Sequence, residues 1–484
     1  MRHWGTMRFV SFIVTSLALF ATPARAAAIE LAPCAIEGTG EPARCGTLEV
    51  WENRETRSGR RIPVKVVVFP AKAKTPAPDP LFVIAGGPGQ SATEFSGVLI
   101  RDFAFAHERR DVVFVDQRGT GGSNPLHCPL GGSFNDIIQM VAIGVDADLA
   151  AVAACRAELE RRADLRLYTT PIAMDDLEEV RAALGYERIN LFGASYGTRA
   201  ALVYMRQYPG RVRSAILRAL GSIDLKLPAT VAADGERALN RLFGACSADA
   251  ACRKAFPLLE QTLKTVVERL EKSPVTVKTA DPRSGTTHEV RVDHNVFGTT
   301  MFFLMFMTDW AKDLPRIVHA AGRGDYAPLA AVLPLNVLTA LPVHWGMRRS
   351  VLCSEDVTLT SEADIRRAGL DTVVGDTSNL GLLAACREWP AGPLPAGYFD
   401  PIETGVPILA ISGVEDPVLP PHRAEAALTW LPNATHVVVP GTAHGPNFPG
   451  CVRELADTFL EAGSGKDLDP ACVLAVRRPP FTTP

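Results

Sequence analysis

The stretch INLFGASYGTRAAL, residues 189–202, decides the fold. A short apolar run leads to Ser195, which stands between Gly193 and Gly197, and a segment with helical spacing follows. Glycines are expected there because the turn is too tight for larger side chains. A serine at this turn would project above the carboxyl end of a sheet, and the helix behind it would favour negative charge. The stretch therefore predicts a nucleophile elbow; the alternative is an ordinary small-residue turn.

A serine hydroxyl is a poor nucleophile unless a base removes its proton, so partners are expected downstream. Asp416 follows a predicted strand at 406–413, and His444 follows the next one at 435–441. The order Ser195, Asp416, His444 is the chain order of α/β-hydrolases. We expect His444 to take the serine proton and return it to the leaving group, and Asp416 to orient the imidazole.

Other side chains compete for these two roles. Glu415 adjoins Asp416 and is a rival acid, although the Asp-Pro turn favours Asp416. Among the histidines, His422 begins a helix and His436 opens a strand, so both are less suitable than His444.

Acyl transfer also needs N–H donors for the oxyanion. The segment IAGGPGQSA, residues 84–92, follows a predicted core strand and precedes a helix. Pro88 has no N–H. We therefore expect the backbone N–H groups of Gly87 and Tyr196 to form the oxyanion hole, with Gly86 as the alternative to Gly87. The competing interpretation is a glycine turn without a catalytic role.

The order of the predicted elements gives the fold class. Short β-branched runs alternate with helical segments up to about residue 225, and the alternation resumes near residue 406. The intervening stretch is mostly helix-like. These patterns predict an α/β-hydrolase core with a mostly parallel sheet and an inserted helical cap. The expected domains are a core in two parts, residues 27–225 and 401–484, and a cap at 226–400.

The N-terminus predicts export. Positive charge in MRHWGTMR precedes an apolar run at 9–20, and ATPARA ends in a small-x-small pattern. Because the run is too short to span a bilayer, residues 1–26 are interpreted as a secretory signal peptide. The alternative is an uncleaved anchor. We expect a secreted or periplasmic protein with no membrane span after signal removal. With a formal charge of −3, the chain lacks the excess of basic residues that is typical of nucleic-acid-binding proteins.

All ten cysteines lie after the signal segment, which fits an oxidising compartment. No CxxC or Cys/His cluster with zinc spacing occurs, so no metal and no cofactor are expected. Spacing alone leaves connectivity open, and several free thiols are the alternative. Pairing near neighbours predicts five bridges: Cys34 with Cys45, Cys128 with Cys155, Cys246 with Cys252, Cys353 with Cys386, and Cys451 with Cys472.

Several motifs together resemble one family. They are GGPGQSA (86–92), VDQRGTGGSNP (115–125), the segment 168–202, and the tail from residue 406 to about 463. The chain resembles secreted tripeptidyl-aminopeptidase-like α/β-hydrolases, in the prolyl-aminopeptidase family of serine peptidases. The resemblance covers about residues 30–225 and 400–475. It implies a helical cap, a TAP-like C-terminal segment and cleavage of short units from a free peptide N-terminus, and it supports the Cys451–Cys472 pair.

Substrate choice is expected to lie in the cap, which resembles the family only through CSEDV (353–357) and CREWP (386–390). An aminopeptidase must hold a cationic amine, and a buried carboxylate can do so. Glu355 and Asp356 are the candidates; solvated surface acids are the alternative. Arg218 stands where the family usually has the aspartate of an LDG sequence, which argues against amine recognition there.

Two further features concern the surroundings of the site. The segment MFFLMFM, residues 301–307, is interpreted as cap core, with an apolar pocket as the alternative. Arg118 is interpreted as structural, fixing a loop beside the site.

The sequence thus predicts an exported, cofactor-independent serine hydrolase that acts through an acyl-enzyme. Its most favoured substrates are short peptides with a free N-terminus, from which it would release one to three residues. A carboxylesterase acting on small acyl or aryl esters is the alternative enzyme, because the same triad serves both reactions. A catalytically inactive binding protein with this fold is the alternative outside enzymes, and the intact triad argues against it.

Overall fold

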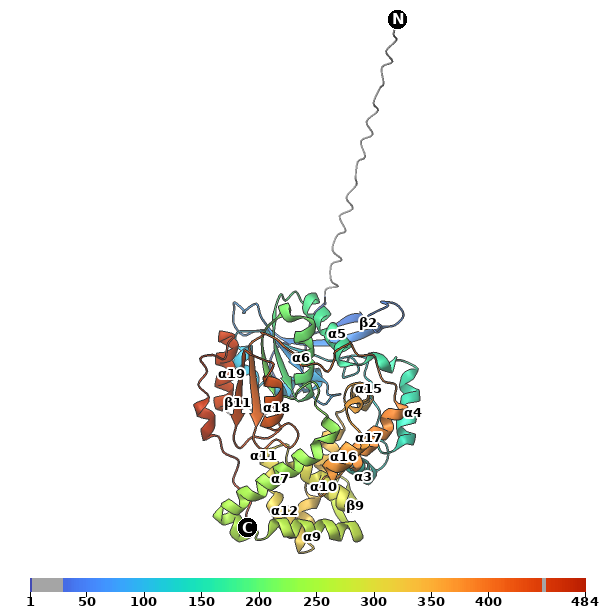
Figure 1. The fold of residues 1–484 in the computed structure, drawn as a ribbon, viewed down its shortest axis with the longest axis vertical. Coiled ribbons are helices and arrows are strands. Elements are labelled where there is room, and N and C mark those ends of the chain that lie inside the picture. The colour runs from blue at the N-terminus through green and yellow to red at the C-terminus, as the bar shows by residue number, and fades with distance from the viewer. Residues whose placement is uncertain (2–28, 446–449) are drawn as a thin grey trace.

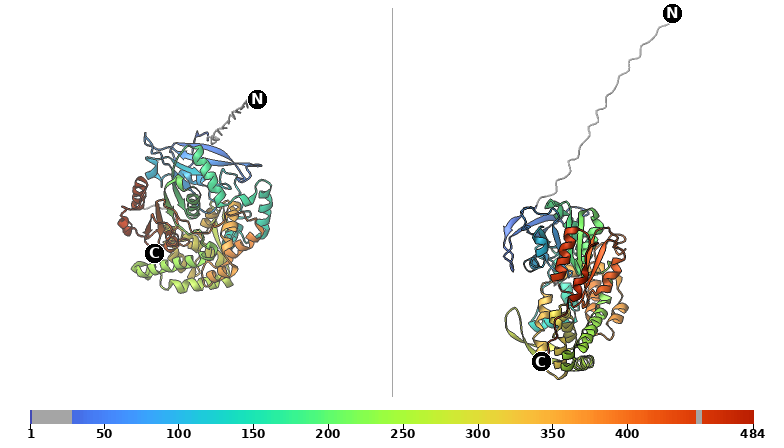
Figure 2. Two further views of the ribbon diagram at one scale, coloured as in Figure 1. Left: turned by 45° about the horizontal axis from the view of Figure 1, so that its top comes forward. Right: turned by 90° about the vertical axis from the view of Figure 1, so that its left-hand side faces the viewer.

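The structure is a computed structural model that describes residue 1, residues 29–445 and residues 450–484. The predicted signal peptide, apart from Met1, lies outside the described residues. A mixed sheet with helices on both faces forms one layer of the molecule, and a mostly helical layer lies below it in Figure 1. Figure 2 shows the same two layers from other sides.

The sheet has the order β1-β2-β3-β5-β4-β6-β7-β10-β11. The first three strands and β5 pair antiparallel, and every pair from β5 to β11 is parallel. This confirms the predicted mostly parallel sheet. The strands are β1 Ala32–Cys34, β2 Ala43–Trp51, β3 Arg61–Phe69, β4 Leu81–Ile84, β5 Val112–Val115, β6 Ile189–Ala194, β7 Val212–Arg218, β10 Ile408–Gly413 and β11 Ala434–Val439.

The sheet separates two apolar clusters. Strands β4 and β5 are buried along their whole length, as short apolar runs in a covered sheet should be. One cluster packs α5, α6 and α18 on the sheet, and the other packs α1, α2 and α19 on the opposite face. These helices are α1 Ala92–Leu99, α2 Ala104–His107, α5 Thr170–Ala183, α6 Tyr196–Gln207, α18 Pro421–Leu428 and α19 Gly450–Ala462.

The inserted segment is mostly helical, with a two-stranded antiparallel hairpin that was not predicted. Its strands are β8 Val275–Ala280 and β9 Thr287–Val292. Its helices are α7 Val231–Ala248, α8 Ala250–Ala255, α9 Leu259–Lys272, α10 His294–Leu304, α11 Thr308–Ala311, α12 Leu314–Gly322, α13 Ala327–Ala330, α14 Pro334–Ala340, α15 Trp345–Glu355, α16 Glu362–Gly369 and α17 Thr377–Glu388.

Further helices lie in the connections. Two are α3 Phe134–Ile143 and α4 Leu149–Glu160. Short 3-10 turns are η1 Leu165–Leu167, η2 Pro209–Arg211, η3 Leu227–Ala229, η4 Val357–Leu359 and η5 Pro470–Ala475.

Packing crosses the predicted domain limits in both directions. Helix α3, which precedes the insertion, contributes Phe134 and Ile138 to the apolar cluster of the cap. Within the insertion, Met347 and Val351 of α15 belong to the cluster that covers the sheet. The limits at residues 225 and 400 therefore stay a prediction, and α15 is a cap helix packed directly on the core.

All five predicted cysteine pairs form disulfides: Cys34–Cys45, Cys128–Cys155, Cys246–Cys252, Cys353–Cys386 and Cys451–Cys472. Among the described helices, none is by itself both long and apolar enough to cross a membrane. One bent pair, Ala327–Ala340 with Trp345–Leu359, meets that test by length and composition, with an angle of 74° between its halves.

Candidate active site

Ser195 lies at the sharp turn between β6 and α6. Its backbone has φ 55° and ψ −125°, a region that side-chain-bearing residues rarely occupy. A Cβ added at Gly193 would lie 2.4 Å from the carbonyl oxygen of Gly197, and one added at Gly197 would lie 2.5 Å from that of Ile84. Both glycines are therefore required by close backbone contacts, as the elbow prediction supposed.

The strand order brings the three predicted triad residues to one end of the sheet. Strands β6, β7, β10 and β11 are consecutive neighbours and run parallel. Ser195 follows β6, Asp416 follows β10 and His444 follows β11. Since the carboxyl ends of parallel strands meet at the same edge, all three residues lie on that edge.

Asp416 and His444 are in direct contact. The ring Nδ1 of His444 lies 3.0 Å from Oδ1 and 2.8 Å from Oδ2 of Asp416. The carboxylate is fully buried, and the backbone N–H groups of Val418 and Leu419 donate to Oδ1 at 2.7 and 2.8 Å. With Nδ1 engaged in this way, Nε2 is the ring nitrogen left to serve as the base for a serine.

The surroundings of Asp416 favour its ionised form. Burial alone would raise the pKa of Asp416, but the His444 ring and the N–H groups of Leu419 and Val418 outweigh burial and hold that pKa below its ordinary value. The carboxylate is thus charged at neutral pH, as an orienting partner of the imidazole must be.

The rival residues have other contacts. His422 Nε2 lies 3.4 Å from Asp234 Oδ1, and His436 Nε2 lies 2.9 Å from Ser412 Oγ. Glu415 is partly buried and lines a small pocket together with Arg478. His444, rather than these histidines, is the ring that contacts Asp416.

The cap covers the histidine through the segment 301–307. The Phe306 ring lies edge-on to the His444 ring at 5.1 Å between centroids, and the Gly445 N–H donates to the Phe306 carbonyl at 2.8 Å. Met301 and Met305 point into the apolar cluster of the cap. The segment therefore contributes both to the cap core and to the wall beside His444.

The glycine loop lies directly against the serine. A Cβ added at Gly86 would lie 3.4 Å from the Ser195 Cβ. Gly87 has φ 110°, and within the described part of the chain no acceptor binds its N–H or that of Tyr196. Arg348 of α15 donates from Nη1 to the Gly87 carbonyl at 3.1 Å. The assignment of Gly87 and Tyr196 as oxyanion donors stays a prediction, with this geometry in its favour.

Glu355 and Asp356, the predicted amine ligands, are both fully buried and already bonded within the protein. Glu355 accepts hydrogen bonds from Thr170 and from the Tyr398 hydroxyl, the latter at 2.6 Å. Asp356 pairs with both terminal nitrogens of Arg199, each at 2.7 Å. They are not solvated surface acids, and their role as amine ligands stays a prediction.

Two arginines near the site have clear contacts. Arg118 is fully buried and donates to both carboxylate oxygens of Asp176, as well as to three backbone carbonyls, which agrees with its interpretation as structural. Arg218 ends β7; its carbonyl accepts the Ser195 N–H at 2.9 Å, and its Nη2 donates to the Ala443 carbonyl at 3.2 Å. Burial lowers the pKa of Arg218 to about 10, against the attraction of Asp416.

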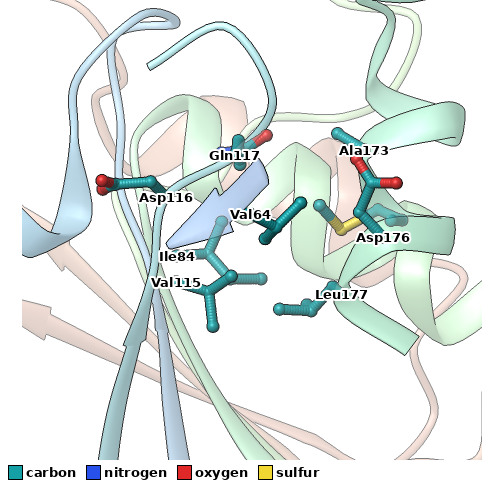
Figure 3. Close-up of a pocket in the computed structure, with 9 residues that line it drawn as sticks. Val64, Ile84, Val115, Asp116, Gln117, Ala173, Asp176 and Leu177 are labelled. Carbon is teal, nitrogen blue, oxygen red and sulfur yellow. The ribbon is translucent and has the colours of Figure 1, made fainter. Parts of the chain in front are cut away.

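A small interior pocket lies between strand ends and α5 (Figure 3). It is lined by Asp116, Gln117 and Asp176 with apolar neighbours, and no predicted triad residue lines it. In the parts of the chain that the structure describes, no group of His, Cys, Asp and Glu could hold a metal ion.

Comparisons with known proteins agree with this fold. Residues 79–255 match the family model of the α/β-hydrolase fold, and residues 371–472 match that of TAP-like proteins. The chain contains an α/β-hydrolase domain and a TAP-like domain. It is 24% identical over 468 residues to the serine protease Hip1 of Mycobacterium tuberculosis, covering 87% of this chain and 86% of the relative.

One further relative and one solved structure are also similar to this chain. A tripeptidyl aminopeptidase of Streptomyces coelicolor is 29% identical over 212 residues, or 41% of this chain and 39% of that protein. The crystal structure of a proline iminopeptidase from Mycobacterium smegmatis aligns with a TM-score of 0.41 and 16% identity, covering 86% of this chain and 98% of that one.

Sequence reasoning missed two residues around this site. Thr170 links Glu355 to the Tyr196 hydroxyl, and Arg348 binds the glycine loop. Each contact joins segments far apart in the chain, so no spacing rule could have indicated it.

Proposed function

We propose that this chain is a serine aminopeptidase that releases one to three residues from free peptide N-termini through an acyl-enzyme. The observation that carries the proposal is the contact between buried Asp416 and partly buried His444, at the same sheet edge as the strained Ser195 turn. The names of the relatives, a serine protease and a tripeptidyl aminopeptidase, support peptides as the substrate class.

The reaction follows from these residues. Ser195 Oγ attacks the scissile carbonyl while His444 Nε2 accepts its proton, and Asp416 stabilises the imidazolium. The N–H groups of Gly87 and Tyr196 donate hydrogen bonds to the tetrahedral oxyanion and so stabilise its negative charge. His444 then protonates the departing amine, the C–N bond breaks, and the acyl group remains on Ser195. A water molecule, deprotonated by His444, hydrolyses that ester and restores the enzyme.

We further propose that the protein acts outside the cytoplasm. The signal-like segment at 1–26 and the five disulfides support export, because such bridges persist in oxidising compartments. The proposed aminopeptidase activity includes the predicted contact of Glu355 or Asp356 with the substrate amine. That contact requires the substrate to replace one of the present hydrogen-bond partners of the carboxylate.

The first test is hydrolysis of mono-, di- and tripeptidyl aminocoumarins with free N-termini, beside N-acetylated versions and p-nitrophenyl acetate. We expect free peptides to be cleaved, acetylation to abolish cleavage, and Ser195→Ala to lower kcat/KM at least about 1,000-fold. Turnover of the ester alone, lost with Ser195, would indicate the carboxylesterase. Failure of a fluorophosphonate probe to label the mature protein would contradict both and leave the inactive binding protein.

A further inference from the structure

Helix α15 touches both sides of the proposed oxyanion hole. It belongs to the cap by sequence but packs on the core, where a Cβ added at Gly119 would lie 2.8 Å from the Met347 side chain. Arg348 and Glu355 are seven residues apart, so they lie on one face of the helix, two turns and about 10 Å apart. Each of these two side chains connects to a different proposed oxyanion donor.

The C-terminal end of α15 connects to Tyr196. Glu355 accepts the Thr170 N–H at 2.7 Å and the Thr170 hydroxyl at 2.8 Å. The same Thr170 oxygen lies 2.8 Å from the Tyr196 hydroxyl. Thr170, Tyr196 and Glu355 are all buried, so these bonds are not exchanged with water. Three side chains thus connect α15 to the residue whose N–H follows Ser195.

A second contact fixes the same end of the helix to α6. Asp356, directly after α15, forms a two-pronged ion pair with Arg199, which lies one turn after Tyr196 on α6. Bidentate pairs of this kind define orientation as well as distance. The start of α6, where the Tyr196 N–H lies, is therefore held at two points.

The N-terminal end of α15 connects to the glycine loop. Arg348 Nη1 donates to the Gly87 carbonyl at 3.1 Å, and the His344 backbone N–H donates to the Gly89 carbonyl at 2.8 Å. A Cβ added at Gly89 would lie 2.9 Å from the His344 carbonyl oxygen. The loop that carries the Gly87 N–H is therefore packed tightly against this end of the helix.

We propose that α15 sets the separation and direction of the two oxyanion donors, with Glu355 and Arg348 as positioning residues. The inference rests on the proposed function, since it assumes that the Gly87 and Tyr196 N–H groups bind the oxyanion. A donor displaced by a fraction of an ångström stabilises the transition state less and leaves substrate binding unchanged. The cap helix would then act on the chemical step for every substrate, including one without an amine.

The test uses p-nitrophenyl acetate, which has no amine to recognise. Thr170→Val removes the hydroxyl between Glu355 and Tyr196, and Arg348→Met removes the bond to Gly87. The matched control is Ser354→Ala on the same helix, which removes a partly buried hydrogen bond from the Gly392 N–H at 2.8 Å and contacts neither proposed donor. For each variant we would measure kcat, KM, and inhibition by a phenylalkyl trifluoromethyl ketone and by the corresponding methyl ketone.

The trifluoromethyl ketone reports on the oxyanion hole directly. Ser195 Oγ adds to its carbonyl, the proton passes to His444, and the resulting hemiketal oxygen carries the negative charge. We expect Thr170→Val and Arg348→Met each to lower kcat about tenfold with KM unchanged. Both variants should weaken inhibition by the trifluoromethyl ketone about tenfold and leave inhibition by the methyl ketone unchanged. Ser354→Ala should lower only the melting temperature.

Failure of the positioning role and failure of the proposed function give different results. Variants that behave like Ser354→Ala would overturn the positioning role of α15. A Glu355→Ala variant that leaves ester kcat intact would contradict the positioning role, whatever its KM for free-amine peptides. If Ser195→Ala retains full ester turnover, the proposed function fails instead, because the nucleophile is then elsewhere.

Discussion

Ser195 combines a chemical role with a conformational cost. Its φ and ψ values belong to a region that only glycine occupies without strain, and such a residue costs about 1–3 kcal/mol. Gly193 and Gly197 cannot relieve this strain, because both are already in close contact with backbone oxygens. The surrounding sheet and helix therefore hold the serine in place against its own backbone preference.

This strain predicts that Ser195→Gly is more stable than Ser195→Ala. Both variants remove the hydroxyl, but only glycine adopts the backbone angles of residue 195 freely. We expect the free energy of unfolding to be higher by about 1 kcal/mol in the glycine variant. Denaturant unfolding of the two inactive variants, followed by two spectroscopic probes, measures the difference; equal stability would show that the turn is unstrained.

At the scale of elements, the parallel part of the sheet was predictable, and the strands β1 and β2 and the cap contacts were not. Apolar runs ending in Gly, Pro or Asp marked the parallel strands. The elbow and the strand that precedes Asp416 indicated which edge of the sheet carries the site. The hairpin β8–β9 was missed because the surrounding helical pattern dominated that region. The acid pair 355–356 was visible in sequence, but its partners Thr170 and Arg199 are more than 150 residues away.

The disulfide Cys353–Cys386 joins α15 to α17 and offers a test at this scale. It closes a loop of 33 residues, whereas Cys246–Cys252 closes one of six and lies away from the site. Loop entropy predicts that replacing the first pair by alanine lowers the free energy of unfolding by about 4 kcal/mol, and replacing the second by about 2. We also expect ester kcat to fall only for the first.

Denaturant unfolding and ester kinetics of the two double variants check this prediction. Equal kinetic effects would mean that the disulfide does not act through α15.

At the scale of the whole molecule, cap and core are bonded at several separate places. Asp234 of α7 is fully buried and accepts a bond from Arg423 of α18 at 2.9 Å. Residues of α15 pack in the cluster that covers the sheet, and residues of α3 pack in the cap cluster. Because each layer contains part of the other, we expect them to unfold together, so a titrating group at their junction affects the stability of the whole chain.

Glu355 is such a group, and the direction of its pKa shift determines whether stability rises or falls with pH. Burial raises the pKa of Glu355 above its ordinary value, against the charge of Arg199 and the bonds from Tyr398 and Thr170. Between the unfolded pKa, about 4.3, and the higher folded pKa, the native state binds more protons than the unfolded one. The stability of the wild type should therefore fall relative to Glu355→Gln as the pH rises through that window.

Asp416 supplies the opposite case as a control. Its folded pKa is lowered, so its contribution to stability is fully present above the unfolded pKa, about 3.9, and is lost only as the pH falls through the folded value. As the pH falls through that folded value, the unfolding free energy of the wild type should decrease relative to that of Asp416→Asn. From pH 5 to 7, the unfolding free energy of the wild type should decrease relative to that of Glu355→Gln. Unfolding series at several pH values measure both; a flat difference for Glu355 would mean that its carboxylate is ionised across the range, with Arg199 outweighing burial.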